Sequence, residues 1–229
     1  MNIRVIGTGS RGNTYLLNAE NETLVLDAGM PFKTVKIAMG FDVARISGVL
    51  ISHMHGDHAK YAREYEKAGI PVIRSYEAES YGAESLTEHH RLGGFDVMSF
   101  PCIHDAPCVG YRIYHPEMGK MVYATDTEYV KYRFRDTSVI LIEANWSEEY
   151  VNKDDPRWGH ILTGHMSLQT ALDCIKANKN PMLRNVILCH LSELNASPKD
   201  FKAAAEAVVG DKVRVDIAEK GKVIELGGE

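Results

Sequence analysis

The stretch ISGVLISHMHGDH, residues 46–58, decides both the fold and the chemistry that this chain can perform. Residues 46–52 are apolar almost throughout and predict a buried strand. Gly56 lets the backbone turn directly after that strand without a Cβ clash. Three imidazoles and one carboxylate stand within the six residues that follow the strand: His53, His55, Asp57 and His58. Side chains of these types suit zinc as ligands, and also manganese or iron.

The spacing of the four side chains predicts two metal ions. On a turning loop, His53 and His55 can face one metal while Asp57 and His58 face a second. Two divalent ions roughly 3.5–4 Å apart can share a hydroxide and clamp an in-line displacement. The competing interpretation is a polar loop whose histidines are incidental, and the spacing directly after an apolar strand disfavours it. We therefore expect two divalent metal ions, zinc or manganese, with iron as a further possibility.

Six residues cannot complete two coordination shells, so other ligands must come from distant parts of the chain. His104, Asp126 and His190 each follow an apolar segment that predicts a strand, where metal and catalytic residues accumulate in layered folds. Asp126 is the natural bridging ligand because a carboxylate can span two cations. For each residue alone, a capping aspartate or a hydrogen-bonded histidine explains its position equally well.

Composition and pattern indicate an ordinary globular protein. The chain has 229 residues, of which 45% are hydrophobic and 25% charged, with no repeat and no evident linker. Strand patterns with interposed helices in both halves predict two packed sheets with helices outside them. Residues 59–68, 167–178 and 198–209 predict helices, and residues 88–91 predict a solvated loop.

Net charge and cysteine usage limit the partners and the cellular environment that the sequence is compatible with. The net charge of −5 gives no global attraction to nucleic acid, although a local basic rim is compatible with it. The four cysteines have no C-x-x-C spacing and suit reduced core thiols, while Cys102 and Cys108 flank His104 and leave a metal or redox role open. The beginning MNIRVIGTGS lacks a signal-peptide pattern, and no apolar run has transmembrane length, so we expect a cytoplasmic protein without a membrane partner.

The motifs LVLDAG with Asp27, ISHMHGDH, His104, YATDTE and LCHLSE occur in this order, and together they resemble the metallo-β-lactamase superfamily over nearly the whole chain. This resemblance implies an α/β four-layer αβ/βα sandwich, a single domain over residues 1–229, with a binuclear site along one edge. Asp27 would be an orienting residue near that site. The resemblance implies a first metal on His53, His55 and His104, a second on Asp57, His58 and His190, and Asp126 as the bridge.

Narrower motifs are similar to one branch of this superfamily. GTGSRGNTYLL, HDAPCVGY, GHMS and HLSELN resemble the YycJ/WalJ-type group, whose members are regarded as nucleic-acid hydrolases, some as 5′–3′ DNA exonucleases. Glu143 and the His165 of GHMS resemble a pair in the RNase Z enzymes. That resemblance implies that His165 protonates the leaving oxygen while Glu143 fixes its tautomer. Leu168 departs from the GHLSN form that is more usual in the YycJ/WalJ-type group.

These residues predict a binuclear metal-dependent hydrolase, a phosphodiesterase or nuclease in which Asp57 orients a metal-bridging hydroxide for attack on phosphorus. DNA or RNA, exonuclease or endonuclease, and the oligomeric state stay open. A glyoxalase II-like thioesterase would use the same ligands, but no basic cluster suits the glutathione carboxylates. A secreted β-lactamase is a further alternative, which we disfavour because we find no export-signal pattern. We also disfavour a non-catalytic scaffold, because it would not need the complete ligand set. Candidate rim residues for a nucleic acid are Arg11, Lys33, Lys60, Arg157 and Lys199, with Tyr129 and Trp158 as stacking platforms.

Overall fold

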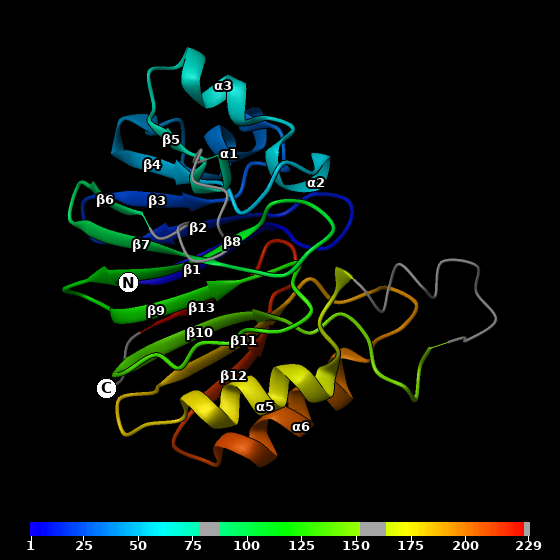
Figure 1. Ribbon diagram of the computed structural model, residues 1–229. Helices are drawn as coiled ribbons and strands as arrows, with labels where there is room; N and C mark the ends of the chain where they lie inside the picture. The colour runs from blue at the N-terminus through cyan, green and yellow to red at the C-terminus, as the bar shows by residue number, and fades with distance from the viewer. Residues whose placement is uncertain (78–87, 152–163, 227–229) are drawn as a thin grey trace.

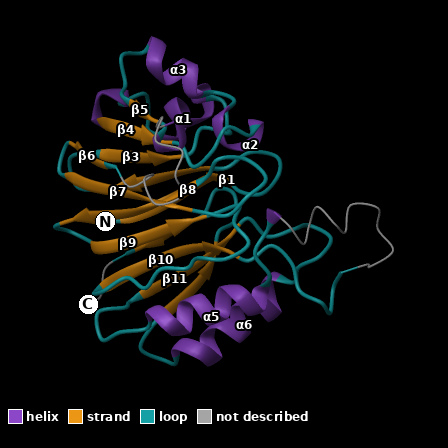
Figure 2. Cartoon of the chain, in the orientation of Figure 1, coloured by secondary structure: helices purple, strands orange, loops and turns teal. Residues whose placement is uncertain are grey.

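Two mixed β-sheets lie face to face between two groups of helices, which gives four layers (Figure 1; Figure 2). The computed structural model describes residues 1–77, 88–151 and 164–226, so Arg157 and Trp158 lie outside the described residues. This arrangement confirms the α/β sandwich that the sequence predicts.

The first sheet has six strands in the order β13-β1-β2-β3-β4-β5. β1, β2 and β3 form an antiparallel meander, in which a short turn at residues 19–22 joins β2 to β3. β4 then joins parallel to β3 through a crossover that contains α1. The strands are β1 (Asn2–Gly7), β2 (Thr14–Asn18), β3 (Thr23–Leu26), β4 (Ile46–Leu50), β5 (Val72–Ile73) and β13 (Val223–Glu225).

The second sheet has seven strands in the order β12-β11-β10-β9-β8-β7-β6, and β9 to β12 run parallel. The prediction of a loop at residues 88–91 is wrong, because His89–Leu92 forms the edge strand β6, which pairs antiparallel with β7. Its polar residues, of which His89 and Arg91 are exposed, made the segment resemble a loop. The strands are β6 (His89–Leu92), β7 (Phe95–Pro101), β8 (Val109–His115), β9 (Gly119–Ala124), β10 (Thr137–Glu143), β11 (Asn185–Cys189) and β12 (Arg214–Ile217).

The helices cover the two outer faces. The single helix expected over residues 59–68 is divided in two, because the backbone N–H of Tyr61 donates to the carbonyl of Ala28 and leaves the helical pattern. Ser167 accepts a hydrogen bond from the N–H of Thr170 and so caps the helix expected there. Within the described ranges, every helix is too short or too polar to cross a membrane. The helices are α1 (Phe32–Ala38), α2 (Gly56–Ala59), α3 (Ala62–Lys67), α5 (Leu168–Asn178) and α6 (Pro198–Val209), with short 3-10 turns at Val43–Arg45 and Ser75–Glu77.

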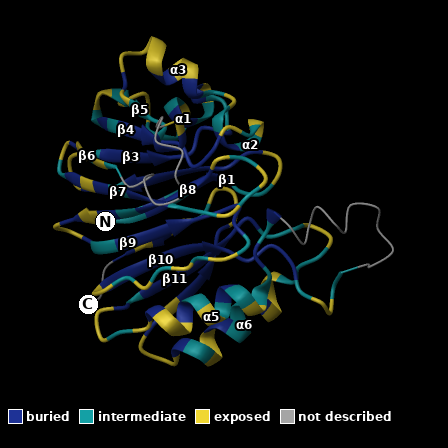
Figure 3. Cartoon of the chain, in the orientation of Figure 1, coloured by how far each residue is buried: buried dark blue, intermediate teal, exposed yellow. Residues whose placement is uncertain are grey.

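The apolar core has two layers, and strand β10 separates them. Val139 and Leu141 pack between the two sheets, while Ile140 and Ile142 pack against α5 and α6. This alternation follows from the two-residue period of a strand, and every residue of β10 is buried because both of its faces are covered (Figure 3).

The strand directions place the candidate site. β3 and β4 run parallel in one sheet, and β9, β10 and β11 run parallel in the other, so the carboxyl ends within each sheet meet at one edge. Asp27, Asp126 and His190 follow three of these strands in the left-handed region, with φ of 58°, 47° and 52°. The backbone therefore turns sharply where each strand ends.

Candidate metal centre

Asp27 orients two of the candidate ligands. It is fully buried directly after β3, where its Oδ1 accepts the N–H of Ser52 (2.7 Å) and its Oδ2 accepts Nδ1–H of His58 (2.7 Å). The hydroxyl of Ser52 donates to Asp27 (3.1 Å) and accepts Nδ1–H of His53 (3.0 Å). Both imidazoles therefore use Nδ1 as a donor, which leaves the lone pair of each ring on Nε2.

Among the candidate ligands in the described residues, two buried nitrogen atoms lack a hydrogen-bond partner. They are Nε2 of His53 and Nε2 of His190. Burial, reinforced by the neighbouring His58, lowers the pKa of His53 to about 2, so that ring is neutral. An unpaired buried polar atom costs on the order of 1–3 kcal/mol. A cation bound at each nitrogen would satisfy it, so the donor set fits divalent metal ions.

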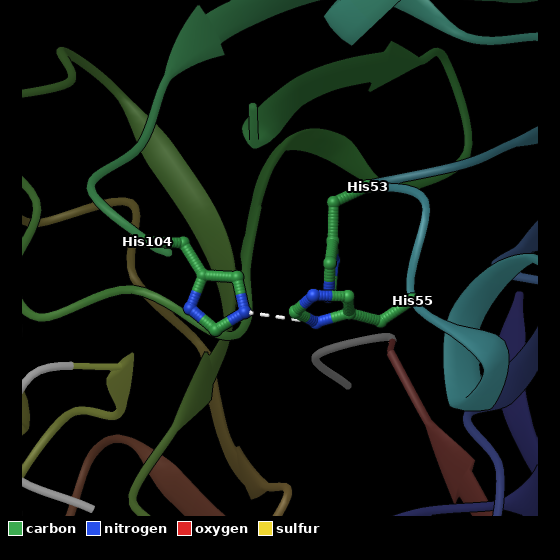
Figure 4. A group of neighbouring side chains, drawn as sticks. All are labelled: His53, His55 and His104. Atoms are coloured by element: carbon green, nitrogen blue, oxygen red, sulfur yellow. Dashed lines mark hydrogen bonds between the residues drawn. The ribbon is translucent and has the colours of Figure 1, made fainter. Parts of the chain in front are cut away.

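The first metal group consists of His53, His55 and His104, whose candidate ligand atoms all lie within 4.8 Å of one another. Figure 4 shows the three rings converging from two separate loops. His104 donates Nδ1–H to the carbonyl of Gly164 (2.9 Å), and its Nε2 lies 3.2 Å from Nδ1 of His55. Burial lowers the pKa of His104, which favours the neutral ring that a metal requires.

The second metal group consists of Asp57, His58, Asp126 and His190, again with ligand atoms within 4.8 Å. Asp126 also reaches the first metal group, because its Oδ2 lies 3.2 Å from Nε2 of His58 and 3.6 Å from Nε2 of His53. Burial alone would raise the pKa of Asp126, but His190 and His58 hold it well below its usual value. The structure thus brings together the seven residues that the sequence singles out, with an ionised carboxylate between the two groups.

Glu143 connects this centre to His165. Its Oε1 accepts Nδ1–H of His165 (2.8 Å) and lies 2.9 Å from Nδ1 of His190. Its Oε2 accepts the backbone N–H groups of Thr127 (3.2 Å) and Met166 (3.3 Å), so the fully buried carboxylate is fixed at both oxygens. Burial lowers the pKa of His165, but the hydrogen bond to Glu143 outweighs this and raises it.

A cavity of about 430 Å³ opens over the two metal groups. His55, Asp57, His104 and His165 are on its wall. Of the described rim candidates, Arg11 lines this cavity, and its guanidinium is already paired with Glu193 at 2.8 Å. Lys33, Lys60, Lys199 and Tyr129 do not line it. A second cavity of about 440 Å³ lies at the opposite ends of β2 and β3 and contains none of the candidate ligands.

The sequence patterns missed four residues that contact the centre. The hydroxyl of Ser52 connects Asp27 to His53 through two hydrogen bonds, and the hydroxyl of Tyr123 donates a hydrogen bond to Asp27. The amide nitrogen of Asn13 lies 2.9 Å from Nε2 of His58, at the lone pair that a cation would take. Asp105 faces the first metal group. A polar residue at the end of an apolar strand was the available signal for Ser52, and the position directly after His104 was the signal for Asp105.

Comparison with known proteins agrees with this geometry. The metallo-beta-lactamase superfamily profile matches residues 7–84. The exodeoxyribonuclease YycJ of Bacillus anthracis is 23% identical over 93% of this chain and 90% of its own length. A metal-dependent hydrolase of Pyrococcus abyssi is 24% identical over 90% of this chain and 93% of its own.

A solved structure shares the fold along the whole length. The metallo-beta-lactamase fold protein YhfI from Bacillus subtilis superposes with a TM-score of 0.70 at 20% identity, covering 98% of this chain and 99% of that one. The fold prediction and the resemblance stated from the motifs are both confirmed. The chain has the metallo-β-lactamase fold, and its His/Asp cluster and sequence matches together support a metal-dependent hydrolase.

Proposed function

We propose that this hydrolase cleaves phosphodiester bonds of nucleic acid and that His165 acts as its general acid. The observation that carries the proposal is that His165, in the wall of the cavity, is held at 2.8 Å by the buried Glu143 beside the second metal group. A metal site alone serves many hydrolytic reactions. A buried carboxylate that orients an additional imidazole is a device for proton transfer.

The proposed ligands are divided between the two groups. His53, His55 and His104 would hold the first cation, while Asp57, His58 and His190 would hold the second, with Asp126 reaching both. Zinc and manganese both suit this set of imidazoles and carboxylates, and iron is compatible with it. When bound, the two cations would lower the pKa of the attacking water and stabilise charge on the phosphoryl oxygens.

Asp57 is placed to orient the attacking water. Its Oδ2 lies 3.3 Å from Nε2 of His58 and 3.6 Å from Nε2 of His190, and the residue lines the cavity. Burial would raise its pKa, but the neighbouring imidazoles of His190 and His58 hold that pKa well below its usual value. The side chain therefore stays ionised and can accept a hydrogen bond from water across the neutral pH range.

In this proposal, His165 protonates the leaving oxygen. Since Nδ1–H is given to Glu143, Nε2 is the nitrogen left to act toward the cavity that the ring lines. An alkoxide leaving group from a nucleotide needs a proton as it departs, whereas a thiolate, with a pKa near 8.5, leaves without one. The pair thus favours a phosphodiester over a thioester substrate, and the similarity to an exodeoxyribonuclease supports nucleic acid as its source.

The direct test offers competing substrates to the metal-reconstituted protein. End-labelled single- and double-stranded DNA and RNA, a lactam and a thioester are incubated with the zinc form and then with the manganese form. Cleavage of a labelled nucleic acid is expected, and turnover of the thioester alone would contradict the proposal. Asp57→Asn and His55→Ala are expected to abolish the cleavage.

A leaving-group comparison isolates the role of His165. His165→Ala is expected to slow nucleic-acid cleavage by about 10²–10⁴-fold while sparing metal binding. With bis(p-nitrophenyl) phosphate, whose phenolate departs without a proton, the same variant should lose much less activity. His89→Ala is the matched control, since His89 lies exposed on β6 beside Asp96 and away from the cavity. Equal losses with both substrates would mean that His165 is not the acid.

A further inference from the structure

We infer that Asp105 supplies an oxygen ligand to the first metal group, in addition to the imidazoles of His53, His55 and His104. This inference rests on the metal assignment proposed above and extends it to a residue outside the seven proposed ligands. It gives the first group a second carboxylate oxygen beside that of the bridging Asp126.

Asp105 is delivered by a short loop with a closed base. β7 and β8 are antiparallel neighbours, and the N–H of Cys102 donates to the carbonyl of Cys108 at 3.0 Å, which continues their ladder to the loop. The loop thus presents residues 103–107 from a fixed base. His104 and Asp105 both reach the first metal group from this loop.

The distances place one carboxylate oxygen between two imidazoles. Oδ1 of Asp105 lies 3.1 Å from Nε2 of His104 and 3.4 Å from Nε2 of His55. The side chain is 43% exposed, while that of His104 is 1% exposed, so the carboxylate approaches from the solvent side. A cation among these rings would be within reach of the carboxylate without a large movement.

The hydrogen-bonding character of the atoms around Asp105 favours a cation between them. His104 gives its Nδ1 proton to the carbonyl of Gly164, so in the neutral ring Nε2 carries a lone pair. A carboxylate is also only an acceptor, and Nδ1 of His55 lies 3.2 Å from the same Nε2. A single proton can relieve one of these contacts between acceptors, whereas a divalent ion satisfies all three atoms at once.

An oxygen ligand changes the metal preference of the group. Imidazoles suit zinc, and carboxylates shift a site toward manganese. The charge of Asp105 also offsets part of the charge of the cation, which three neutral imidazoles do not. Removing the carboxylate should therefore weaken Mn²⁺ binding more than Zn²⁺ binding.

Metal titrations of the metal-free full chain test this inference. In Asp105→Asn, one of two binding events is expected to weaken by about 10–100-fold, the range seen when groups that support a metal site are lost. The effect should be larger for Mn²⁺, and Asp105→Glu should restore part of it. Asp96→Asn is the matched control, because Asp96 is another exposed aspartate beside a histidine, with a side chain that is 50% exposed.

His104→Ala distinguishes a failure of the inference about Asp105 from a failure of the metal assignment. If it loses one binding event while Asp105→Asn binds both ions as the parent does, the inference about Asp105 is wrong and the metal site stands. If His104→Ala keeps both events, the metal assignment itself is wrong, and the inference fails with it. A Co²⁺-loaded protein adds a second readout, because the visible absorption of cobalt changes with its ligands. An unchanged spectrum in Asp105→Asn would overturn direct ligation.

Discussion

Asp27→Asn tests how the fold prepares a ligand for the second metal group. Asp27 is fully buried and accepts four hydrogen bonds, from the N–H and hydroxyl of Ser52, Nδ1–H of His58 and the hydroxyl of Tyr123. Asparagine keeps the shape but has one oxygen. Because the backbone N–H of Ser52 needs that oxygen, the amide NH₂ must take the position of Oδ2 and face Nδ1–H of His58.

Two facing donors are relieved when the imidazole changes tautomer. The proton then moves from Nδ1 to Nε2 of His58, and the ring loses the lone pair that points to the second metal group. A hydrogen bond to a charged group contributes about 1.5–3 kcal/mol. At about 1.4 kcal/mol per factor of ten, the second cation should bind about 10- to 150-fold more weakly.

Calorimetric metal titration measures this loss, and the first metal group should keep its affinity. Tyr123→Phe is the matched control, since it removes one hydrogen bond from Asp27 but leaves the carboxylate that accepts from His58. Circular dichroism establishes that both variants are folded. Wild-type affinity at both sites in Asp27→Asn would show that Asp27 does not set the tautomer of His58, and the orientation argument would fail.

Three further changes follow from individual contacts. Glu143→Gln should lower kcat and move the alkaline limb of the pH–rate profile to lower pH, because Glu143 raises the pKa of the acid His165; an unmoved limb would contradict this role. Glu22 is partly buried, which raises its pKa, but hydrogen bonds from Ser47 and Gly94 outweigh this and lower it. A carboxylate whose pKa is lowered in the folded state stabilises the fold at pH values above its unfolded pKa, and this stabilisation is lost as the pH falls. Glu22→Gln should therefore lower the free energy of unfolding in urea by about 1 kcal/mol at pH 7 and change it little in acid. Phe201→Ala should cost about 3–5 kcal/mol, because that ring is fully buried on the inner face of α6, and an unchanged urea midpoint would contradict the packing.

The candidate site residues that the sequence could predict are those that stand directly after a predicted strand. The cluster at residues 53–58 is local, and His104, Asp126 and His190 stand where apolar segments end, so the carboxyl-edge rule was enough to select them. Ser52 and Asp105 carried weaker signals, which were the end of an apolar strand and the position directly after His104. Their roles depend on which atoms face each other across β3, β4 and the loop after β7, and single-sequence periodicity does not encode that. The break at Tyr61 was hidden for the same reason, since its N–H bonds to a carbonyl 33 positions earlier in the chain, that of Ala28.

The left-handed backbone at Asp27, Asp126 and His190 links the fold to its chemistry. A continuing strand would send each side chain to one face of its sheet, whereas a positive φ turns the chain directly at the strand end, where the two sheet edges meet. Such a conformation costs on the order of 1–3 kcal/mol for a residue other than glycine, and aspartate tolerates it better than most. A cation at 100 times its dissociation constant stabilises the folded chain by about 2.7 kcal/mol, which is comparable to the strain at one or two of these residues. Strain at the strand ends and metal binding therefore have opposite effects on the free energy of unfolding. The turns that destabilise the metal-free fold also bring the ligands to one point, where a bound cation stabilises the fold.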